Sequence, residues 1–420
     1  MTMELEEPAA SILPRAASGT GGSRAAPIAK ESRIGDIDII RGMALFGVLM
    51  MNLALAFRVP FFGNRPPTDL PLLERIVFRV ELIVLSGKAM TLFSILFGVG
   101  LAIFLERASA RGSGAMWLLL RRVLFLTAFG VAHAFLVWHG DILMSYSATA
   151  LIALFFLRRR SAVLLAALGV CLVWPLARAL WPALFEFTND SAPGHYDEAF
   201  RIYSAGSYLD VVRFRVHEIL HLEFPSYVFL LPDELTRMLI GILLWRSGIL
   251  QLATRERYRR ALLWVASVGI LAGVGYGGYR WIYFELYHPP PGPPSMLRMM
   301  IMLNTTLLCA LGYGAGLLLL LRQAKWRERL GVFAPLGRMA FTNYLTQSIV
   351  FSTVFYGYGF GLLGKVGYGG VALMGIALYV LQTIASAIWL RHFLFGPFEW
   401  AWRSLTYGQL QPFRRIASPA

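Results

Sequence analysis

The sequence predicts an all-α fold, a polytopic transmembrane helical bundle of about ten helices with a small extracytoplasmic helical cap. Two features of the composition predict this class, since 57% of the 420 residues are hydrophobic and only 15% are charged. A soluble domain carries about 45–50% apolar and about 25% charged residues. The third observation is a series of apolar segments, which at about 20 residues each can cross a bilayer as helices.

Ten segments of this kind follow one another along the chain. They cover residues 38–57, 82–105, 118–138, 141–157, 161–184, 227–250, 261–284, 298–321, 336–356 and 367–394. The third and fourth are joined by only a few residues around Gly140, which predicts a tight hairpin. The longest connection, residues 185–226, is polar and rich in acidic residues, and we expect it to form the cap with one or two short helices.

Basic residues orient this bundle. Arginines and lysines concentrate in the N-terminal tail, in alternate connections and near the C-terminus, and loops of this kind face the cytoplasm. We therefore expect both termini in the cytoplasm, with the hairpin and the cap on the other side. The chain then divides into a disordered tail (1–32), one transmembrane domain (33–412) and a short tail (413–420). The net charge of +15 lies in these short runs, so nucleic acid is not an expected partner.

The most informative polar residues surround the predicted hairpin, in the stretch HAFLVWHGDILMSY (133–146). Ionisable groups at membrane depth are costly, so they usually serve a function. A neutral imidazole at His133 can accept a proton, and a carboxylate at Asp141 can fix its tautomer, so both are candidate catalytic residues. Two alternatives stay open: Asp141 caps the following helix, or His133 is structural and bonds a neighbouring helix. His139 is a supporting polar residue.

Basic residues at the cytoplasmic helix ends are candidates for binding an anionic donor. Asp38 and Arg41 are three residues apart and can pair along one helix face. Alternatively, Arg41 reaches into the bundle and binds a phosphate or carboxylate with its fork-shaped guanidinium. Arg121 and Arg122 are the other candidates for the donor's phosphates.

Further polar residues interrupt the apolar helices. Asn343 and Gln347 are spaced i,i+4 within one predicted helix, so we expect both to face the bundle interior. Asn52 lies three turns deeper in the first helix than its charged pair. We expect all three to support the site.

The stretch His217-Glu218-x-x-His221 matches the H-E-x-x-H pattern, in which two histidines bind zinc and the glutamate activates water. Charged flanks at Arg215 and Glu223, and the lack of a clear third ligand, argue against a zinc site. A membrane zinc peptidase is therefore the weaker alternative, and no metal is expected.

Several stretches together resemble the YeiB family of bacterial polytopic membrane proteins, a domain-of-unknown-function family (418). They are RIGDIDIIRGMALFGVLMMN (33–52), GKAMTLFSILFGVGLA (87–102), RR…GVAHAFLVWHGDILMSYS (121–147), YSAGSYLDVVRFR (203–215), GRMAFTNYLTQS (337–348) and FGPFEWAWRSLTYGQLQP (395–412). The resemblance runs in order over nearly the whole of 33–412. It implies a multi-pass protein of the bacterial inner membrane. Motif positions include Arg41, His133, Gly140, Asp141, Asn343, Glu399, Trp400 and Arg403, whereas His139 and the H-E-x-x-H stretch do not match.

The family is distantly similar to polytopic acyltransferases that transfer an acetyl group to a sugar. The similarity lies in the opening Asp-x-x-Arg-Gly helix and in a histidine inside the bundle, but the spacing around His133 differs. It implies acyl transfer from a cytosolic thioester such as acetyl-CoA to a hydroxyl of an envelope glycan, lipid or small molecule. His133 would then be general base or transient acyl carrier, and Asp141 its orienter or a ligand of the acceptor.

The main alternative is a small-molecule transporter in which His133 and Asp141 relay protons. The lack of a detectable internal repeat disfavours it, because many transporters are built from repeats, and glycine-broken helices favour it mildly. The expected partners are the lipid bilayer and the acceptor, and the sequence gives no oligomeric state.

Overall fold

The structure is a computed structural model that describes residues 35–55, 70–112, 114–180, 195–252, 256–287 and 296–415. Within these ranges the regular structure is helical and no strand element occurs; one isolated bridge joins Phe393 and Arg414. The predicted all-α fold is therefore confirmed. The predicted tail 1–32 lies outside the described residues.

Each of the ten predicted apolar segments corresponds to a helix. These are α1 (Gly35–Leu55), α3 (Lys88–Ser109), α4 (Ala115–Leu136), α5 (Leu143–Phe156), α6 (Ser161–Leu180), α9 (Phe224–Arg246), α11 (Glu256–Tyr287), α12 (Met296–Leu321), α15 (Ala340–Phe355) and α16 (Tyr368–His392). In the described part of the chain, six helical stretches are long and apolar enough to cross a membrane by length and composition, and α5 and the Ser161–Trp174 part of α6 are shorter apolar helices. Helix α15 has only 16 residues, and α9 carries charges in its middle.

Shorter elements connect these helices. They are α2 (Leu72–Val84), α7 (His195–Ala205), α8 (Tyr208–Glu218), the π-helical turn η4 (Ile219–Glu223), α10 (Ile249–Leu252), α13 (Ala324–Leu330), the 3₁₀ turn η5 (Gly331–Phe333), α14 (Ala334–Arg338) and α17 (Pro397–Tyr407). Helix α2 was not predicted as a separate element. It ends because Gly87 turns the chain with φ of 74°, and α3 begins at the next residue.

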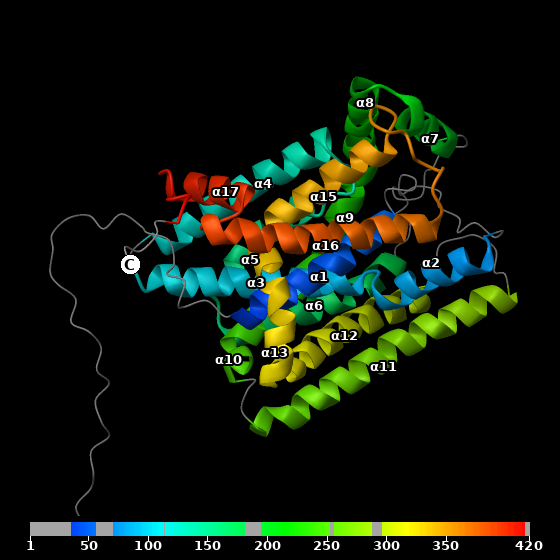
Figure 1. Cartoon of the computed structure of the whole chain (residues 1–420). Coiled ribbons are helices and arrows are strands. Elements are labelled where there is room, and N and C mark those ends of the chain that lie inside the picture. The colour runs from blue at the N-terminus through cyan, green and yellow to red at the C-terminus, as the bar shows by residue number, and fades with distance from the viewer. Residues whose placement is uncertain are drawn as a thin grey trace, which may run out of the picture.

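Helix α1 lies at the centre of the bundle, with α3, α14, α15 and α16 packed around it. Figure 1 shows α11 and α12 side by side at the periphery, α7 and α8 at one end, and α10, α13 and α17 at the opposite end. Helices α7 and α8 fall in the predicted cap. Phe413 and Arg415, which the sequence assigns to the C-terminal tail, form backbone hydrogen bonds with Leu394 and His392.

The backbones of α1 and α14 approach each other closely at Gly337. A Cβ atom at this position would overlap the carbonyl oxygen of Asp38 and would lie 2.8 Å from the backbone nitrogen of Gly42. Only a glycine permits this contact, which holds the last turn of α14 against the start of α1.

We expect Gly337→Ala to lower the free energy of unfolding by about 1–3 kcal/mol, because the added methyl group forces α14 away from α1. Gly316→Ala is the matched control, since a Cβ there meets nothing within 4 Å. The thermal unfolding midpoint of the detergent-purified protein measures both. Equal midpoints for the two variants would contradict the packing described for α1 and α14.

Candidate functional site

The connection between α4 and α5 is buried inside the protein. Helix α5 has 14 residues and is therefore about 21 Å long, shorter than the roughly 30 Å hydrocarbon core of a bilayer. Non-helical backbone at such a depth is tolerated only where protein surrounds it. Trp138, His139 and Asp141 are accordingly at most 2% exposed. The predicted hairpin is present, and its tip is a protected polar site.

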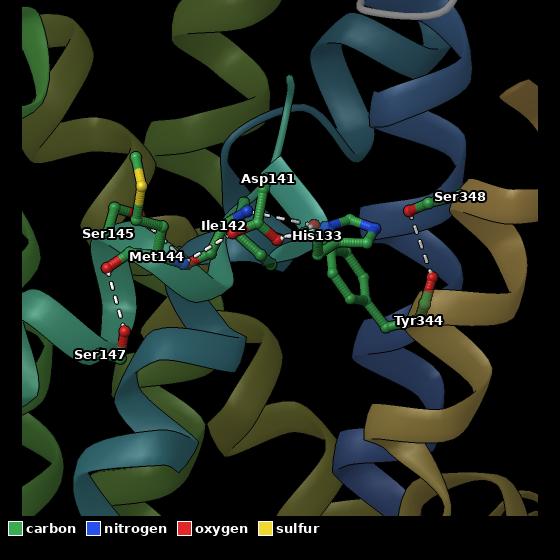
Figure 2. A network of polar contacts seen from close by, with 8 residues as sticks. All are labelled: His133, Asp141, Ile142, Met144, Ser145, Ser147, Tyr344 and Ser348. Atoms are coloured by element: carbon green, nitrogen blue, oxygen red, sulfur yellow. Dashed lines mark hydrogen bonds and ion pairs between the residues drawn. The ribbon is translucent and has the colours of Figure 1, made fainter. Parts of the chain in front are cut away.

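His133 and Asp141 meet at this tip (Figure 2). Nδ1 of His133 lies 2.8 Å from Oδ1 of Asp141, and the side chains are 3% and 0% exposed. The carboxylate at Nδ1 assigns the proton of a neutral imidazole to that nitrogen, which leaves a lone pair on Nε2. Among the residues that the structure describes, none is a hydrogen-bond partner of Nε2.

Asp141 also caps α5. Its Oδ2 accepts the backbone N–H of Met144 at 2.6 Å, in the first turn of that helix. The capping role and the role of orienting His133 were alternatives in the sequence, and the structure combines them because each oxygen serves one. Helix α4 comes close enough at Gly130, where a Cβ would lie 2.6 Å from the nitrogen of Met144.

Tyr344 of α15 completes the polar cluster. Its hydroxyl donates to Oδ1 of Asp141 at 3.2 Å and accepts the backbone N–H of Ile142 at 3.1 Å. The sequence analysis did not single out this residue. The available signal was a tyrosine in an apolar helix, because a buried tyrosine hydroxyl usually has a hydrogen-bond partner.

The cap covers the tip of the hairpin. Tyr203 of α7 places its hydroxyl 3.3 Å from Nδ1 of His139, and Arg215 and Tyr208 of α8 donate to carbonyl oxygens in the last turn of α4, at Phe135 and Leu136. Because these contacts satisfy the C-terminal carbonyls of α4, the cap and the hairpin form one unit. The site is therefore closed on the cap side.

A cavity of about 170 Å³ lies next to the site. Ile142 and Tyr344, which both contact the cluster, are among its lining residues, whereas His133 and Asp141 are not. Apolar side chains form its walls and arginines line it elsewhere; among the lining residues are Phe93, Leu96, Phe97, Val123, Leu126, Phe341, Arg41, Arg122, Arg338 and Arg403. Glu399 is the carboxylate among the lining residues.

The predicted anion-binding residues separate in the structure. Arg41 pairs with Asp38 at 3.0 Å, as one alternative predicted, and also lines the cavity, so its role in binding an anion stays a prediction. Arg122 also lines the cavity, with its guanidinium carbon 3.6 Å from the centre of the Trp402 ring. Arg121 does not line it, and donates instead to the carbonyl oxygen of Leu405 at the end of α17. Arg338 was not predicted from the sequence, and Arg403 was named only as a motif position of the resemblance.

The predicted supporting residues face another helix. Nδ2 of Asn343 donates to Ser386, and Nε2 of Gln347 donates to Gln382, at 2.9 and 2.8 Å. Both partners belong to α16, so these residues join α15 to α16 rather than line the cavity. Asn52 is buried in α1 and does not line the cavity either.

Glu399 fixes α17 to the start of α15. Its Oε1 accepts the backbone N–H groups of Phe341 and Thr342 at 2.8 and 3.0 Å, while the hydroxyl of Thr342 accepts the N–H of Phe398 at 3.1 Å. Each helix thus caps the N-terminus of the other. Burial raises the pKa of Glu399, and these hydrogen bonds oppose the rise.

The H-E-x-x-H stretch does not have the geometry of a zinc site. The rings of His217 and His221 stack with centroids 4.4 Å apart, and Nδ1 of His221 lies 2.9 Å from the carbonyl oxygen of His217. Glu218 is buried against His195 at 3.1 Å. No group of three His, Cys, Asp or Glu side chains able to hold a metal occurs in the described parts of the chain.

The helices and the buried site define a polytopic helical membrane protein with a His–Asp pair beside an arginine-lined cavity. Residues 244–409 match the family described as "Protein of unknown function (DUF418)". The chain is 31% identical to the uncharacterised protein YxaH of Bacillus subtilis (strain 168), over 93% of this chain and 98% of the relative. It is 28% identical to the uncharacterised protein YeiB of Escherichia coli (strain K12), over 91% and 97%. The chain therefore belongs to the DUF418 family, and the resemblance to YeiB is confirmed.

A third relative is the uncharacterised 39.9 kDa protein in the amylase 3′ region of Bacillus acidopullulyticus, 28% identical over 92% of this chain and 97% of the relative. The matched range 244–409 includes Tyr344, Arg338 of α14 and Arg403 of α17, whereas His133 and Asp141 lie before it. The three relatives align with both regions of the chain, since each alignment covers at least 91% of it.

We expect Tyr344→Phe to lower the free energy of unfolding by about 1–3 kcal/mol, because it leaves the buried N–H of Ile142 without its acceptor. Tyr279→Phe is the control, since Tyr279 is 60% exposed and its loss should cost less than about 0.5 kcal/mol. Thermal unfolding of the purified proteins measures both. A wild-type midpoint for Tyr344→Phe would exclude a structural role for its hydroxyl.

The folding stability should also depend on pH through His139. Burial, and next the charge of Arg215, lower the pKa of His139 from 6.5 to about 3. Below pH 6.5 the imidazole of His139 binds a proton in the unfolded chain, whereas in the folded protein it stays neutral down to about pH 3. The free energy of unfolding therefore falls as the pH falls through this window. At about pH 5 the loss is about 2 kcal/mol.

His139→Gln should flatten this dependence, because glutamine does not titrate and can still bond Tyr203. Unfolding midpoints of both proteins between about pH 7.5 and 5 test the prediction. Parallel curves for wild type and variant would show that other groups cause the acid sensitivity.

Proposed function

We propose that this membrane protein is an acyltransferase-like enzyme, which moves an acyl group from a thioester, such as acetyl-CoA or another acyl-CoA, to a hydroxyl. The acceptor is an envelope glycan, a lipid or a small molecule. The observation that supports the proposal is the buried pair of His133 and Asp141, with Nε2 of His133 left for chemistry. An imidazole held at Nδ1 by a carboxylate is the arrangement that a general base requires.

In the proposed reaction, Nε2 of His133 takes the proton of the acceptor hydroxyl while the hydroxyl oxygen attacks the thioester carbonyl carbon. A C–O bond forms, the C–S bond breaks, and the leaving thiolate recovers the proton from His133. Asp141 keeps the imidazole in the required tautomer and stabilises its charged form. In a covalent version, Nε2 carries the acyl group before the acceptor receives it.

The cavity supports the proposal by its position. Ile142 and Tyr344 contact the cluster and also line the cavity, so a ligand next to these two residues would be one residue away from the His–Asp pair. Its apolar walls exclude water, which would otherwise hydrolyse a thioester. The predicted orientation places the arginines toward the cytoplasm, where acyl-CoA is made.

The direct test incubates the purified protein and His133→Ala with acetyl-CoA, and follows free thiol release and intact mass. We expect the variant to lose at least about 100-fold in thiol release, the usual contribution of a general base. His221→Ala is the control, because His221 is exposed on the cap and contacts its own helix. An acyl adduct on the wild type that His133→Ala lacks would favour the covalent version.

Equal thiol release by wild type and His133→Ala would overturn the role proposed for His133. The absence of turnover in wild type would shift the assignment to the second candidate, a small-molecule transporter with His133 and Asp141 as a proton relay. The same buried pair at membrane depth favours that candidate. It predicts pH-driven solute uptake into proteoliposomes with no covalent change to the solute.

A further inference from the structure

We propose that the groove between the start of α4 and the end of α5 is a binding site for an anionic phospholipid. One acyl chain of the lipid lies in the groove, and its phosphate lies at Arg158 and Arg159. The inference is independent of the proposed function, because the groove lies at the opposite end of α5 from the His–Asp pair.

The groove has mainly apolar walls that both helices provide. They consist of Met116 and Leu120 of α4, and Leu151, Leu154 and Phe155 of α5. With its two arginines included, the groove has a volume of about 540 Å³, and sites for small molecules usually have about 300–1,000 Å³. Phe155 is 57% exposed, so this wall faces the surroundings of the bundle rather than its core. In a membrane, the apolar group that meets such a wall is an acyl chain.

Two arginines lie at one end of the groove. Arg158 and Arg159 follow the last turn of α5 and line the groove together with the apolar residues. The guanidinium carbon of Arg159 lies 4.3 Å from the centre of the Phe155 ring, so this side chain lies along the wall. A phospholipid has the same order of groups, an apolar chain followed by a phosphate, and guanidinium groups bind phosphate oxygens well.

The charge of this turn has no counterpart among the described residues. Arg158, Arg159 and Arg160 are exposed, and none of them forms an ion pair with another residue that the structure describes. Between the start of α4 and the end of α6 the sequence has a single acidic residue, Asp141, which lies at the other end of α5. The charge is therefore available to a group outside the protein, and the phosphate of a lipid supplies the opposite charge next to an acyl chain.

Other residues fix the backbone of the turn. Arg246 of α9 donates to the carbonyl oxygens of Leu157 and Arg159 at 2.6 and 2.7 Å, and so satisfies carbonyl groups at the C-terminal end of α5. The carbonyl oxygen of Arg160 accepts a backbone N–H from the first turn of α6 at 2.9 Å. The side chains of Arg158 and Arg159 are thus not required as helix caps.

The groove lies at the level expected for a membrane surface. Trp117, in the first turn of α4, is 61% exposed, and tryptophans concentrate at the boundary between hydrocarbon and water. The arginine turn is also one of the basic connections that predict the cytoplasmic side, and the cytoplasmic leaflet carries anionic lipids. The chemistry of the groove therefore favours an anionic lipid such as phosphatidylglycerol over the zwitterionic phosphatidylethanolamine.

The test is native mass spectrometry of the full-length protein in detergent, titrated with phosphatidylglycerol and, for comparison, with phosphatidylethanolamine. We expect the first phosphatidylglycerol to bind at least about fivefold more tightly than phosphatidylethanolamine. Arg158→Gln and Arg159→Gln should each weaken phosphatidylglycerol binding about fivefold, the usual effect of one basic residue near an anionic headgroup. Arg260→Gln is the matched control, because Arg260 is also exposed, near the start of α11, and does not line the groove.

Two further measurements test the acyl chain. Leu120→Trp fills the groove without a change of charge, and should weaken phosphatidylglycerol binding at least about fivefold because the chain loses its apolar contacts. If this variant does not yield folded protein, Leu151→Phe is a milder substitution in the same wall with the same expected direction. Glycerol 3-phosphate carries the phosphate without the chains, and should bind at least about tenfold more weakly than phosphatidylglycerol.

The inference is overturned if the two lipids bind equally, or if Arg260→Gln weakens binding as much as the two groove variants. Glycerol 3-phosphate that binds as tightly as phosphatidylglycerol, and does so in Leu120→Trp as well, would replace the lipid by a soluble anion and also overturn it. These outcomes do not involve thiol release, so the proposed function is tested separately.

Discussion

The contact between the His133 imidazole and the Asp141 carboxylate organises the site and the helices around it. Either group alone would be costly to bury, because a polar atom in surroundings of low polarity needs a partner. Asp141 uses both oxygens, one toward His133 and Tyr344 and the other toward the first turn of α5. One carboxylate thus ties α4, α5 and α15 together. Tyr344 also lines the cavity, so the same cluster positions one part of the cavity wall.

The two ends of the bundle differ in chemistry. At the cap end, neutral aromatic side chains and the buried Arg215 close over the hairpin and satisfy the last carbonyls of α4. At the opposite end, the cavity is lined with guanidinium groups. The reciprocal capping of α15 and α17 engages the carboxylate of Glu399 with backbone N–H groups at the start of α15. This asymmetry gives the site one charged approach and one sealed side.

Sequence reasoning could predict the helices and the hairpin, because apolar segment length and charge distribution depend on the solvent more than on packing. It could also select His133 and Asp141 as candidate site residues, but it could not predict that they touch, since eight residues and a turn separate them. It could not predict that Arg122 lines the cavity and Arg121 does not. Adjacent residues on a helix face directions about 100° apart, and only the packing of neighbouring helices decides which of them points inward. Arg338 lines the same cavity as Arg41 because α14 packs closely against α1 at Gly337. The periodicity of apolar residues does not predict this contact between helices.

The shortness of α5 has a consequence for the surrounding lipid. In a bilayer that matched the longer helices, the hydrocarbon core would extend beyond the ends of α5. On the cap, Tyr208, Leu209 and Leu220 are each about half exposed. Acyl chains or headgroups would cover such side chains in a thick membrane, and a thinner membrane would leave them in water. Hydrophobic mismatch would thereby act on the cap, which contacts His139 through Tyr203.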